Sequence, residues 1–180
     1  MSLKMAGISK DVEETGLTFL DNAILKATTY QCLSKTPTLA DDSGLAVDAL
    51  NGNPGVKSAR YAGTNASDKQ NRHKLLFELR KVPKNQRDAS FVCVIAVILS
   101  SNAIEIFEGK IRGKIATKEM GYRGFGYDSV FIPDNEKQTM AQLTDDRKMK
   151  ISHRGMALRK TSNWFKSSRI LNEDEYEPNG

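Results

Sequence analysis

The sequence predicts an α/β fold in which a mixed, twisted sheet is flanked by helices. Segments with helical periodicity alternate along the chain with segments of strand-like pattern. The clearest strand covers residues 89–100, where both alternating sets of side chains are apolar, as in a central strand covered on both faces. A strand pair over 89–117 lies between two more helical parts. This arrangement predicts an elongated, two-lobed domain with a central cleft.

The first half of the chain contains two predicted helices and two short strands. Thr18 begins a helical pattern with Asp21 three residues later, as in a capping box, and Pro37 stops the helix. Asp68 is the expected N-cap of the second helix. Turn-forming residues fill positions 51–55. The predicted elements of this half are a helix over 18–33, strands over 38–40 and 45–47, and a helix over 69–81.

The second half carries the centre of the predicted sheet and a last helix. Ser101 and Asn102 turn the chain after the central strand, and residues 104–108 alternate as the return strand, which stays extended to 117. The remaining predicted elements are a glycine-rich loop over 121–126, a short strand over 129–132 closed by Pro133, and a helix that Ser152 caps and that continues to Phe165.

The composition is that of a globular chain without a membrane span. Of the 180 residues, 39% are hydrophobic and 27% are charged, and the longest apolar stretch, 91–99, is far too short to cross a bilayer. No secretory signal begins the sequence, and Cys32 and Cys93 each lie within an apolar pattern, as reduced core cysteines do. We therefore expect a cytoplasmic protein with no membrane partner. Its expected parts are an irregular or tag-derived N-terminus over 1–12, one domain over 13–170 and an acidic tail over 171–180.

The net charge of +5 and the isoelectric point of about 9.2 favour an anionic partner. Nucleic acid, a membrane surface and a phosphorylated small molecule all satisfy this condition, and a solvated basic surface does so as well. The basic residues are densest over 147–160. Charge alone therefore selects no function.

Two acidic pairs are candidates for chemistry. Asp41 and Asp42 follow a predicted buried strand and precede Ser43, and strand ends in α/β sheets are common ligand sites. Carboxylates there suit Mg²⁺ together with phosphate oxygens, and one could accept a proton from an attacking water. A polar Asx turn explains the same residues. Glu13 and Glu14 suit a helix start, and they become site candidates if they face Asp42.

Two further segments could bind a nucleotide. In residues 124–128, glycines flank Phe125, so the backbone can approach a ligand closely and the ring can stack on a base. A tight turn is the alternative interpretation. Lys148, His153 and Arg154 lie near a helix start, where anions bind well, although a solvated basic face explains them equally.

Six segments occur in an order that resembles the inosine/xanthosine triphosphate pyrophosphatase family, and more specifically its bacterial branch. The resemblance covers about residues 13–165. The six segments are EETGLTF at 13–19, NAILKA at 22–27, ADDSGL at 40–45, PGVKSARY at 54–61, GFGYD at 124–128 and ISHRG at 151–155.

The resemblance implies hydrolysis of ITP, dITP and XTP to the monophosphate and pyrophosphate, with Mg²⁺ as cofactor and a homodimer as the assembly. By motif position, Asp42 resembles the general base and a metal ligand. The implied metal carboxylates are Asp42 with its neighbour Asp41, and either Glu13 or Glu14. The implied substrate contacts are Lys26 at the phosphates, Ser43, the base-binding loop of Phe125, Gly126, Tyr127 and Asp128 with Phe125 as the stacking ring, and Lys148, His153 and Arg154 around the base and its 6-keto group.

The chain departs from the family pattern at its start. Family members begin with a strand and a turn of the form Thr/Ser-x-Asn-x-x-Lys, which holds the triphosphate, and nothing before Glu13 matches it. We therefore expect the N-terminal phosphate-binding segment to be missing and the activity to be impaired.

Three other hypotheses stay open. They are a catalytically inactive family member, a pyrophosphatase for pyrimidine nucleotides, and a basic nucleic-acid-binding module. The two acidic pairs would repel phosphates without a cation, so we expect no stable nucleic-acid partner.

Overall fold

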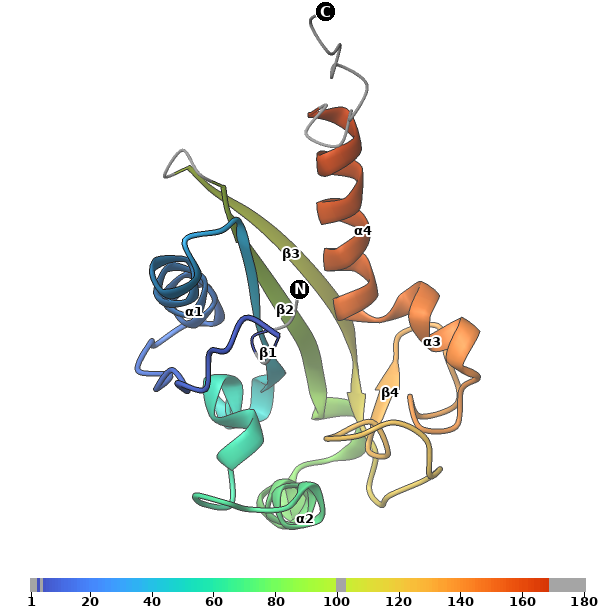
Figure 1. Cartoon of the computed structure of the whole chain (residues 1–180). Helices are drawn as coiled ribbons and strands as arrows, with labels where there is room; N and C mark the ends of the chain where they lie inside the picture. Colours follow the sequence, from blue (N-terminus) through green and yellow to red (C-terminus); the bar gives the residue numbers. More distant parts are fainter. Residues whose placement is uncertain (1–2, 4, 100–102, 169–180) are drawn as a thin grey trace, which may run out of the picture.

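The computed structural model describes residues 3, 5–99 and 103–168, and it contains one sheet flanked by helices (Figure 1). The strand order is β1 (Thr38–Val47), β2 (Asp88–Ile98), β3 (Ile104–Ile115) and β4 (Phe131–Pro133). The predicted class of a sheet with flanking helices is confirmed. In contrast to the expected mixed sheet, every pairing among the described residues is antiparallel. Each strand pairs with its neighbour in sequence, and the β2–β3 connection is too short for a parallel crossover.

Two of the four α-helices in the described part of the chain begin at the capping residue that the sequence predicts. Thr18 and Asp21 form the expected capping box, and Ser152 caps the last helix by accepting the Gly155 N–H at 3.1 Å. The N-cap of the second helix is Ser67, one residue before the predicted Asp68, because its hydroxyl accepts the Gln70 N–H. The α-helices are α1 (Phe19–Ser34), α2 (Asp68–Glu78), α3 (Asp145–Ile151) and α4 (His153–Ser167), of which α3 was not predicted. Short 3₁₀ segments cover Asp48–Leu50, Gly55–Arg60, Leu79–Lys81 and Lys84–Gln86.

The first strand is longer than predicted. Residues 41–44, expected as a turn between two short strands, continue β1 without interruption and pair with β2 over its full length. The polar side chains are tolerated in a strand because Asp41 and Asp42 both find hydrogen-bond partners. The candidate carboxylates therefore lie on a rigid element.

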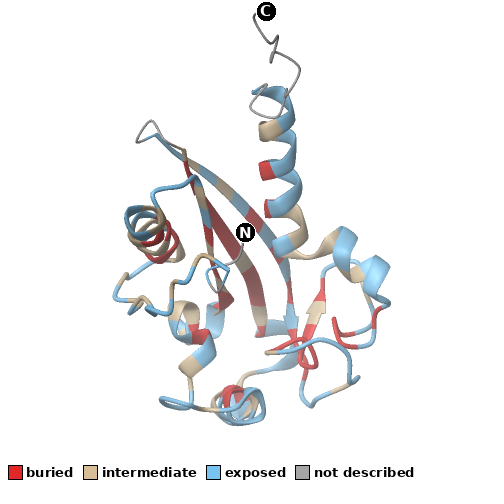
Figure 2. Ribbon diagram, viewed as in Figure 1, coloured by how far each residue is buried: buried red, intermediate tan, exposed pale blue. Residues whose placement is uncertain are grey.

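The central strand divides the core, as its apolar pattern predicted. Cys93, Ile95 and Val97 of β2 pack against Ala157 of α4 on one face. The opposite side chains, Val94, Ala96 and Ile98, pack against α1. Figure 2 shows buried residues along β2 between the two helices. A third cluster, which includes Leu75 of α2 and Leu79 of the 3₁₀ segment that follows it, fills the end of the sheet near β4.

One sequence expectation about the cysteines needs correction, and two others fall outside the described residues. Cys93 is buried as expected, but Cys32 is exposed, because it lies off the face of α1 that carries Ala23 and Ala27. The acidic tail over 171–180 and the turn at 101–102 lie outside the residues that the structure describes. Among those it does describe, no helix is long and apolar enough to cross a membrane.

Candidate active site

The two adjacent aspartates of β1 point to opposite faces of the sheet, because successive side chains of a strand alternate. Asp42 faces α1, where it accepts hydrogen bonds from Lys26 at 3.0 Å and from Asn22 at 3.2 Å. Asp41 faces α4 and accepts one from Arg154 at 2.8 Å. The structure therefore does not bring Asp41 into the same group as Asp42, although the sequence placed both at one metal site.

The side chains around Asp42 form a charged group that we call the carboxylate cluster, made of Glu14, Lys26, Asp42 and Arg60. The Lys26 Nζ lies 2.7 Å from Glu14 Oε1 and 3.0 Å from Asp42 Oδ1. Arg60 donates to Glu14 Oε2 at 3.0 Å and to the Glu14 carbonyl oxygen at 3.1 Å. Glu13 is exposed. Of the two glutamates that the sequence could not separate, it is Glu14 that faces Asp42.

The two carboxylates of the cluster differ in basicity. Burial raises the pKa of Asp42 above its ordinary value, and the nearby Glu14 charge adds to the increase, while Lys26 offsets part of it. Burial also raises the pKa of Glu14, but hydrogen bonds from Lys26 and Arg60 outweigh it and leave that pKa lowered. Asp42 is therefore the better proton acceptor of the pair.

Asn22 is a site residue that the sequence analysis did not single out. It is fully buried, its Nδ2 donates to Asp42, and its Oδ1 accepts the Gly16 N–H at 2.8 Å. It thus ties the segment before α1 to the carboxylate cluster. Its spacing of four residues from Lys26 on one helix face was the signal that could have identified it.

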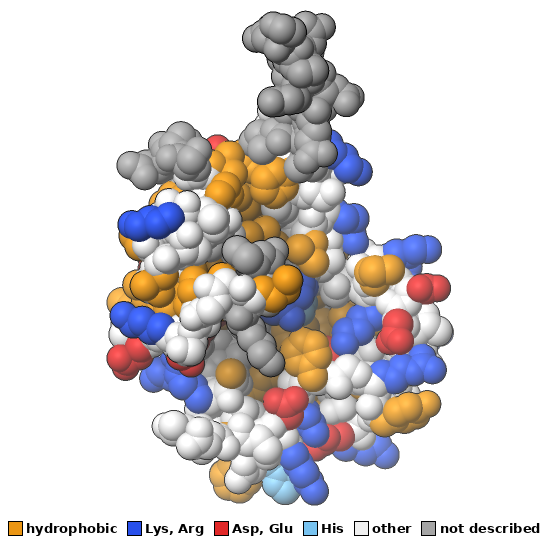
Figure 3. Space-filling view, viewed as in Figure 1, with side chains coloured by type: hydrophobic (Ala, Val, Ile, Leu, Met, Phe, Trp, Pro, Cys, Tyr) orange, Lys and Arg blue, Asp and Glu red, His pale blue; other side chains and the backbone are white. Residues whose placement is uncertain are grey.

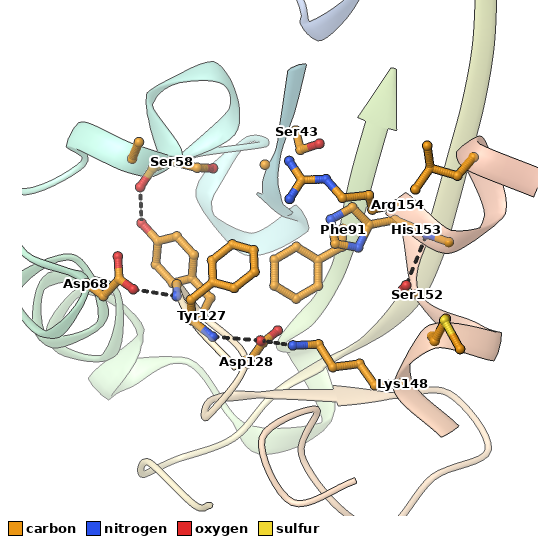
Figure 4. Close-up of a pocket in the computed structure, with 17 residues that line it drawn as sticks. Ser43, Ser58, Asp68, Phe91, Tyr127, Asp128, Lys148, Ser152, His153 and Arg154 are labelled. Atoms are coloured by element: carbon orange, nitrogen blue, oxygen red, sulfur yellow. Dashed lines mark hydrogen bonds and ion pairs between the residues drawn. The ribbon is translucent and has the colours of Figure 1, made fainter. Parts of the chain in front are cut away.

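A pocket of about 380 Å³ lies on the α4 face of the sheet. Figure 3 shows a hollow in the middle of this view, with hydrophobic side chains inside it and Lys and Arg side chains nearby. The pocket brings together residues from the sheet, the 124–128 loop and the start of α4 (Figure 4). The predicted substrate contacts that line it are Ser43, Phe125, Gly126, Tyr127, Asp128, Lys148, His153 and Arg154.

The two aromatic rings of the 124–128 loop have different environments. Phe125 lines the pocket and is 68% exposed, so its ring is free to stack on a ligand. Tyr127 is buried, and its hydroxyl donates to the Ser58 carbonyl oxygen at 2.9 Å. Tyr127 therefore anchors the loop in the core, and Phe125 is the ring available for stacking.

Both backbone polar groups of Gly126 are held by α2. Asp68 accepts the Gly126 N–H at 2.6 Å, and Arg72 donates to the Gly126 carbonyl oxygen at 2.8 Å. Gly126 itself has a φ of +58°, a conformation that glycine adopts without strain. The loop that carries Phe125 is thus fixed by α2 from one side.

An ion pair lies beside the stacking ring. The Lys148 Nζ is 2.5 Å from Asp128 Oδ2, which also accepts the Phe125 N–H at 3.0 Å, and the ammonium lies 5.4 Å from the Phe125 ring centroid. A Cβ at Gly124 would come within 2.1 Å of Asp128 Oδ2. Glycine at 124 therefore allows the pair to form, and the pocket gains a donor and an acceptor next to an aromatic surface.

His153 is held neutral at the start of α4. Its ring stacks on Phe91 with centroids 4.7 Å apart and planes 8° from parallel. Burial, with the nearby positive charges of Arg154 and Lys148, lowers the pKa of His153 to about 4. Its Nδ1 is buried and has no hydrogen-bond partner within the described part of the chain. A neutral imidazole can offer one donor and one acceptor to a ligand.

The pocket and the carboxylate cluster meet at β1. Ser43 lines the pocket, and Asp42, the next residue along the strand, belongs to the cluster on the other face. β1 is an edge strand of the described sheet, so the pocket and the cluster lie on the two faces of its outermost strand.

The cluster offers few protein ligands for a metal. No group of three or more His, Cys, Asp or Glu side chains within residues 3, 5–99 and 103–168 is arranged to hold a metal ion. Glu14 Oε1 and Asp42 Oδ1 do converge on one point, now filled by the Lys26 ammonium. Mg²⁺ is commonly bound by one or two carboxylates with substrate phosphates supplying other ligands, so this donor pair fits it.

Comparisons with known proteins identify close relatives. The family model described as "Ham1 family" matches residues 1–164. The dITP/XTP pyrophosphatase of Bacillus subtilis is 47% identical over 161 residues, which is 89% of this chain and 81% of the relative. That of Yersinia pseudotuberculosis is 48% identical over 152 residues, 83% of this chain and 77% of the relative.

Solved structures agree with this relationship. The Ham1 protein of Staphylococcus aureus is 44% identical and superposes with a TM-score of 0.85 over 89% of this chain and 82% of the other. A HAM1 protein of Coxiella burnetii gives 42% identity and a TM-score of 0.86 over 91% and 84% of the two chains. The family match, which covers most of the sequence, shows that this chain belongs to the Ham1 family.

Proposed function

We propose that this protein hydrolyses non-canonical purine nucleoside triphosphates, namely dITP, XTP and ITP, to the monophosphate and pyrophosphate. The observation that carries the proposal is the junction at β1, where the aromatic pocket at Ser43 adjoins the carboxylate cluster at Asp42. A base and a triphosphate joined by a ribose have the shape that such a junction requires. The curated relatives named dITP/XTP pyrophosphatase support the same activity.

The pocket suits a purine with an oxygen at position 6. The base stacks on Phe125, and cationic donors from Lys148 and Arg154 lie on the pocket wall. A 6-keto group accepts hydrogen bonds from such donors, whereas the 6-amino group of adenine is itself a donor and offers them no acceptor. A donor that faces another donor gains no hydrogen bond, so this pocket discriminates against adenine nucleotides.

The carboxylate cluster suits attack of water on the α-phosphorus. Asp42, the more basic carboxylate, accepts a proton from the water as its oxygen bonds to phosphorus, and pyrophosphate leaves with the bridging oxygen. Lys26 and Arg60 lie where they can bind the phosphate oxygens. Asn22 keeps Asp42 oriented through its 3.2 Å hydrogen bond.

We assign Mg²⁺ as the cofactor, which Asp42 and Glu14 would hold together with the substrate phosphates. When bound, the cation would neutralise the developing charge on the phosphates. Asp41 is not among the proposed ligands, since its carboxylate faces α4.

We also propose a homodimer. Ile104 and Ile106 of β3 leave large apolar side chains 40% and 39% exposed on one face of the sheet, as subunit interfaces often do. Light scattering of the purified protein should give twice the chain mass, and a monomeric mass at micromolar concentration would contradict this part of the proposal.

The activity is tested by pyrophosphate release from dITP, XTP, ITP, ATP and GTP in the presence of Mg²⁺. We expect the first three to be hydrolysed at least about tenfold more efficiently than ATP, since a hydrogen bond from a charged donor contributes roughly 1.5–3 kcal/mol. GTP carries the same 6-keto oxygen, so its rate isolates the effect of the 2-amino group. Loss of the general base in Asp42→Asn should lower kcat by about 10²–10⁴-fold. Asp48→Asn, which removes an equal charge from an exposed ion pair with Arg112, is the matched control and should stay near wild type.

Two outcomes would contradict the proposal. Equal turnover of ATP and XTP would remove the role given to the pocket. An Asp42→Asn variant as active as the Asp48→Asn control would remove the role given to the carboxylate cluster.

A further inference from the structure

The Lys26 ammonium occupies the point at which the two carboxylates of the cluster converge. Its Nζ donates a hydrogen bond to Glu14 Oε1 at 2.7 Å and another to Asp42 Oδ1 at 3.0 Å. The Lys26 side chain is only 16% exposed, and those of Asp42 and Glu14 are 9% and 26% exposed. A cation thus already bridges the two oxygens that a divalent metal would need.

The second oxygen of each carboxylate has its own anchor. Asp42 Oδ2 accepts from Asn22, and Glu14 Oε2 accepts from Arg60. Because these contacts do not involve Lys26, both carboxylates can keep their orientation when the ammonium moves away. The converging oxygens would then be free without any rebuilding of the site.

The charges of the cluster favour one order of events. Two carboxylates and two cationic side chains balance one another, so a divalent cation that approaches the nucleotide-free cluster gains no net attraction. A triphosphate brings several negative charges, and its oxygens compete for the flexible Lys26 side chain. Once Lys26 turns to the phosphates, the carboxylate pair has an open position and an uncompensated negative charge.

We propose that Lys26 is a stand-in cation, which keeps the Glu14–Asp42 pair closed to divalent metal until the phosphates of the substrate draw its ammonium away. The metal and the nucleotide therefore bind together, and the free protein binds metal weakly. This inference rests on the proposed function for the identity of the anion. The weak binding of metal to the free protein is measured without any nucleotide.

The test is a titration of the nucleotide-free protein with Mn²⁺, in which free Mn²⁺ is followed by electron paramagnetic resonance. We expect Lys26→Gln to bind Mn²⁺ at least about tenfold more tightly than wild type, because the variant removes both the positive charge and the occupant of the position. Lys26→Met, an unbranched side chain of similar length, is measured beside it in case the first variant does not fold. Circular dichroism checks the fold of both.

Three controls locate the effect. Lys57→Gln removes an equal charge from an exposed side chain and should bind Mn²⁺ as weakly as wild type. Lys26→Arg keeps the charge at the position and should also bind weakly. The double variant Lys26→Gln/Asp42→Asn should lose the tight site, because one of the two converging oxygens is changed.

The inference is overturned if wild type binds free Mn²⁺ as tightly as the Lys26 variants, or if the double variant retains the tight site. These results are distinct from a failure of the proposed function. A protein that hydrolyses XTP normally, yet shows equal Mn²⁺ affinity in wild type and Lys26→Gln, would lose only the stand-in role of Lys26. A protein without pyrophosphatase activity but with the expected Mn²⁺ affinities would lose only the proposed substrate.

Discussion

The contact between β3 and α4 at Gly109 sets the position of the histidine and arginine that line the pocket. A Cβ built on Gly109 would lie 2.0 Å from the His153 carbonyl oxygen and 2.7 Å from the Ala157 N. Both of these are backbone atoms of the first turns of α4, which no side-chain rotation can move aside. Gly109→Ala is therefore expected to push the start of α4 away from the sheet.

The size of the displacement follows from the distances. Ordinary contacts between heavy atoms are about 3.5 Å, so the backbone at His153 must retreat by roughly 1.5 Å or share that shift with β3. Overpacking of this kind costs roughly 1–3 kcal/mol of stability. A displacement of about 1 Å at a binding group can lower the rate by about 10²-fold, and we expect kcat/KM for XTP to fall by that order.

Urea unfolding and steady-state kinetics measure the two effects together. Gly113→Ala is the matched substitution on the same strand, where the new Cβ would lie 2.2 Å from the Ile132 carbonyl oxygen of β4 instead of α4. We expect a similar loss of stability from this variant, with a smaller loss of kcat/KM.

The reasoning is refuted if the two variants lose activity equally, because the position of α4 would then have no special effect on the site. It is also refuted if Gly109→Ala keeps wild-type stability and activity, since the close approach would then be easily relieved.

Three further predictions follow from other contacts. Because the pKa of His153 falls from 6.5 to about 4 on folding, the unfolded chain takes up its proton first as pH falls. The stability that the neutral imidazole contributes is therefore fully present above pH 6.5, and the free energy of unfolding falls by up to about 3 kcal/mol as the pH drops towards 4. The free energy of unfolding of His153→Gln, measured in urea, should depend less on pH over this range. Arg87 is buried and donates to three main-chain carbonyl groups, so Arg87→Met should lower the free energy of unfolding by at least about 3 kcal/mol, as measured in urea. Arg72→Met frees the Gly126 carbonyl and should raise KM for XTP by about tenfold with kcat little changed; an unchanged KM would exclude α2 from holding the base-binding loop.

Local sequence signals determined the starts of the main helices and the core strand. The capping box at Thr18 and Asp21 and the cap at Ser152 are contacts within a few residues, so the sequence contains all that they need. The apolar pattern over 89–100 predicted a strand covered on both faces for the same reason, because burial on each face follows from alternation along one segment.

The segments of the site were also identifiable from the order of the motifs. The motif order predicts Lys26, Asp42 and the 124–128 loop as site residues, and each lies in the carboxylate cluster or in the pocket. Their chemical roles remain proposals, to be tested by the variants described above.

Only the tertiary structure decided how these segments face one another. Asp41 and Asp42 are neighbours in sequence, yet β1 continues through them and turns their carboxylates to opposite faces, towards Arg154 and Lys26. That the residues form a strand depends on pairing with β2, which lies far along the chain. The same holds for Glu14, which is distinguished from Glu13 by contacts with Lys26 and Arg60. Local pattern fixes which segments form helices and strands, but the partner of a polar side chain depends on distant segments, and no local pattern records it.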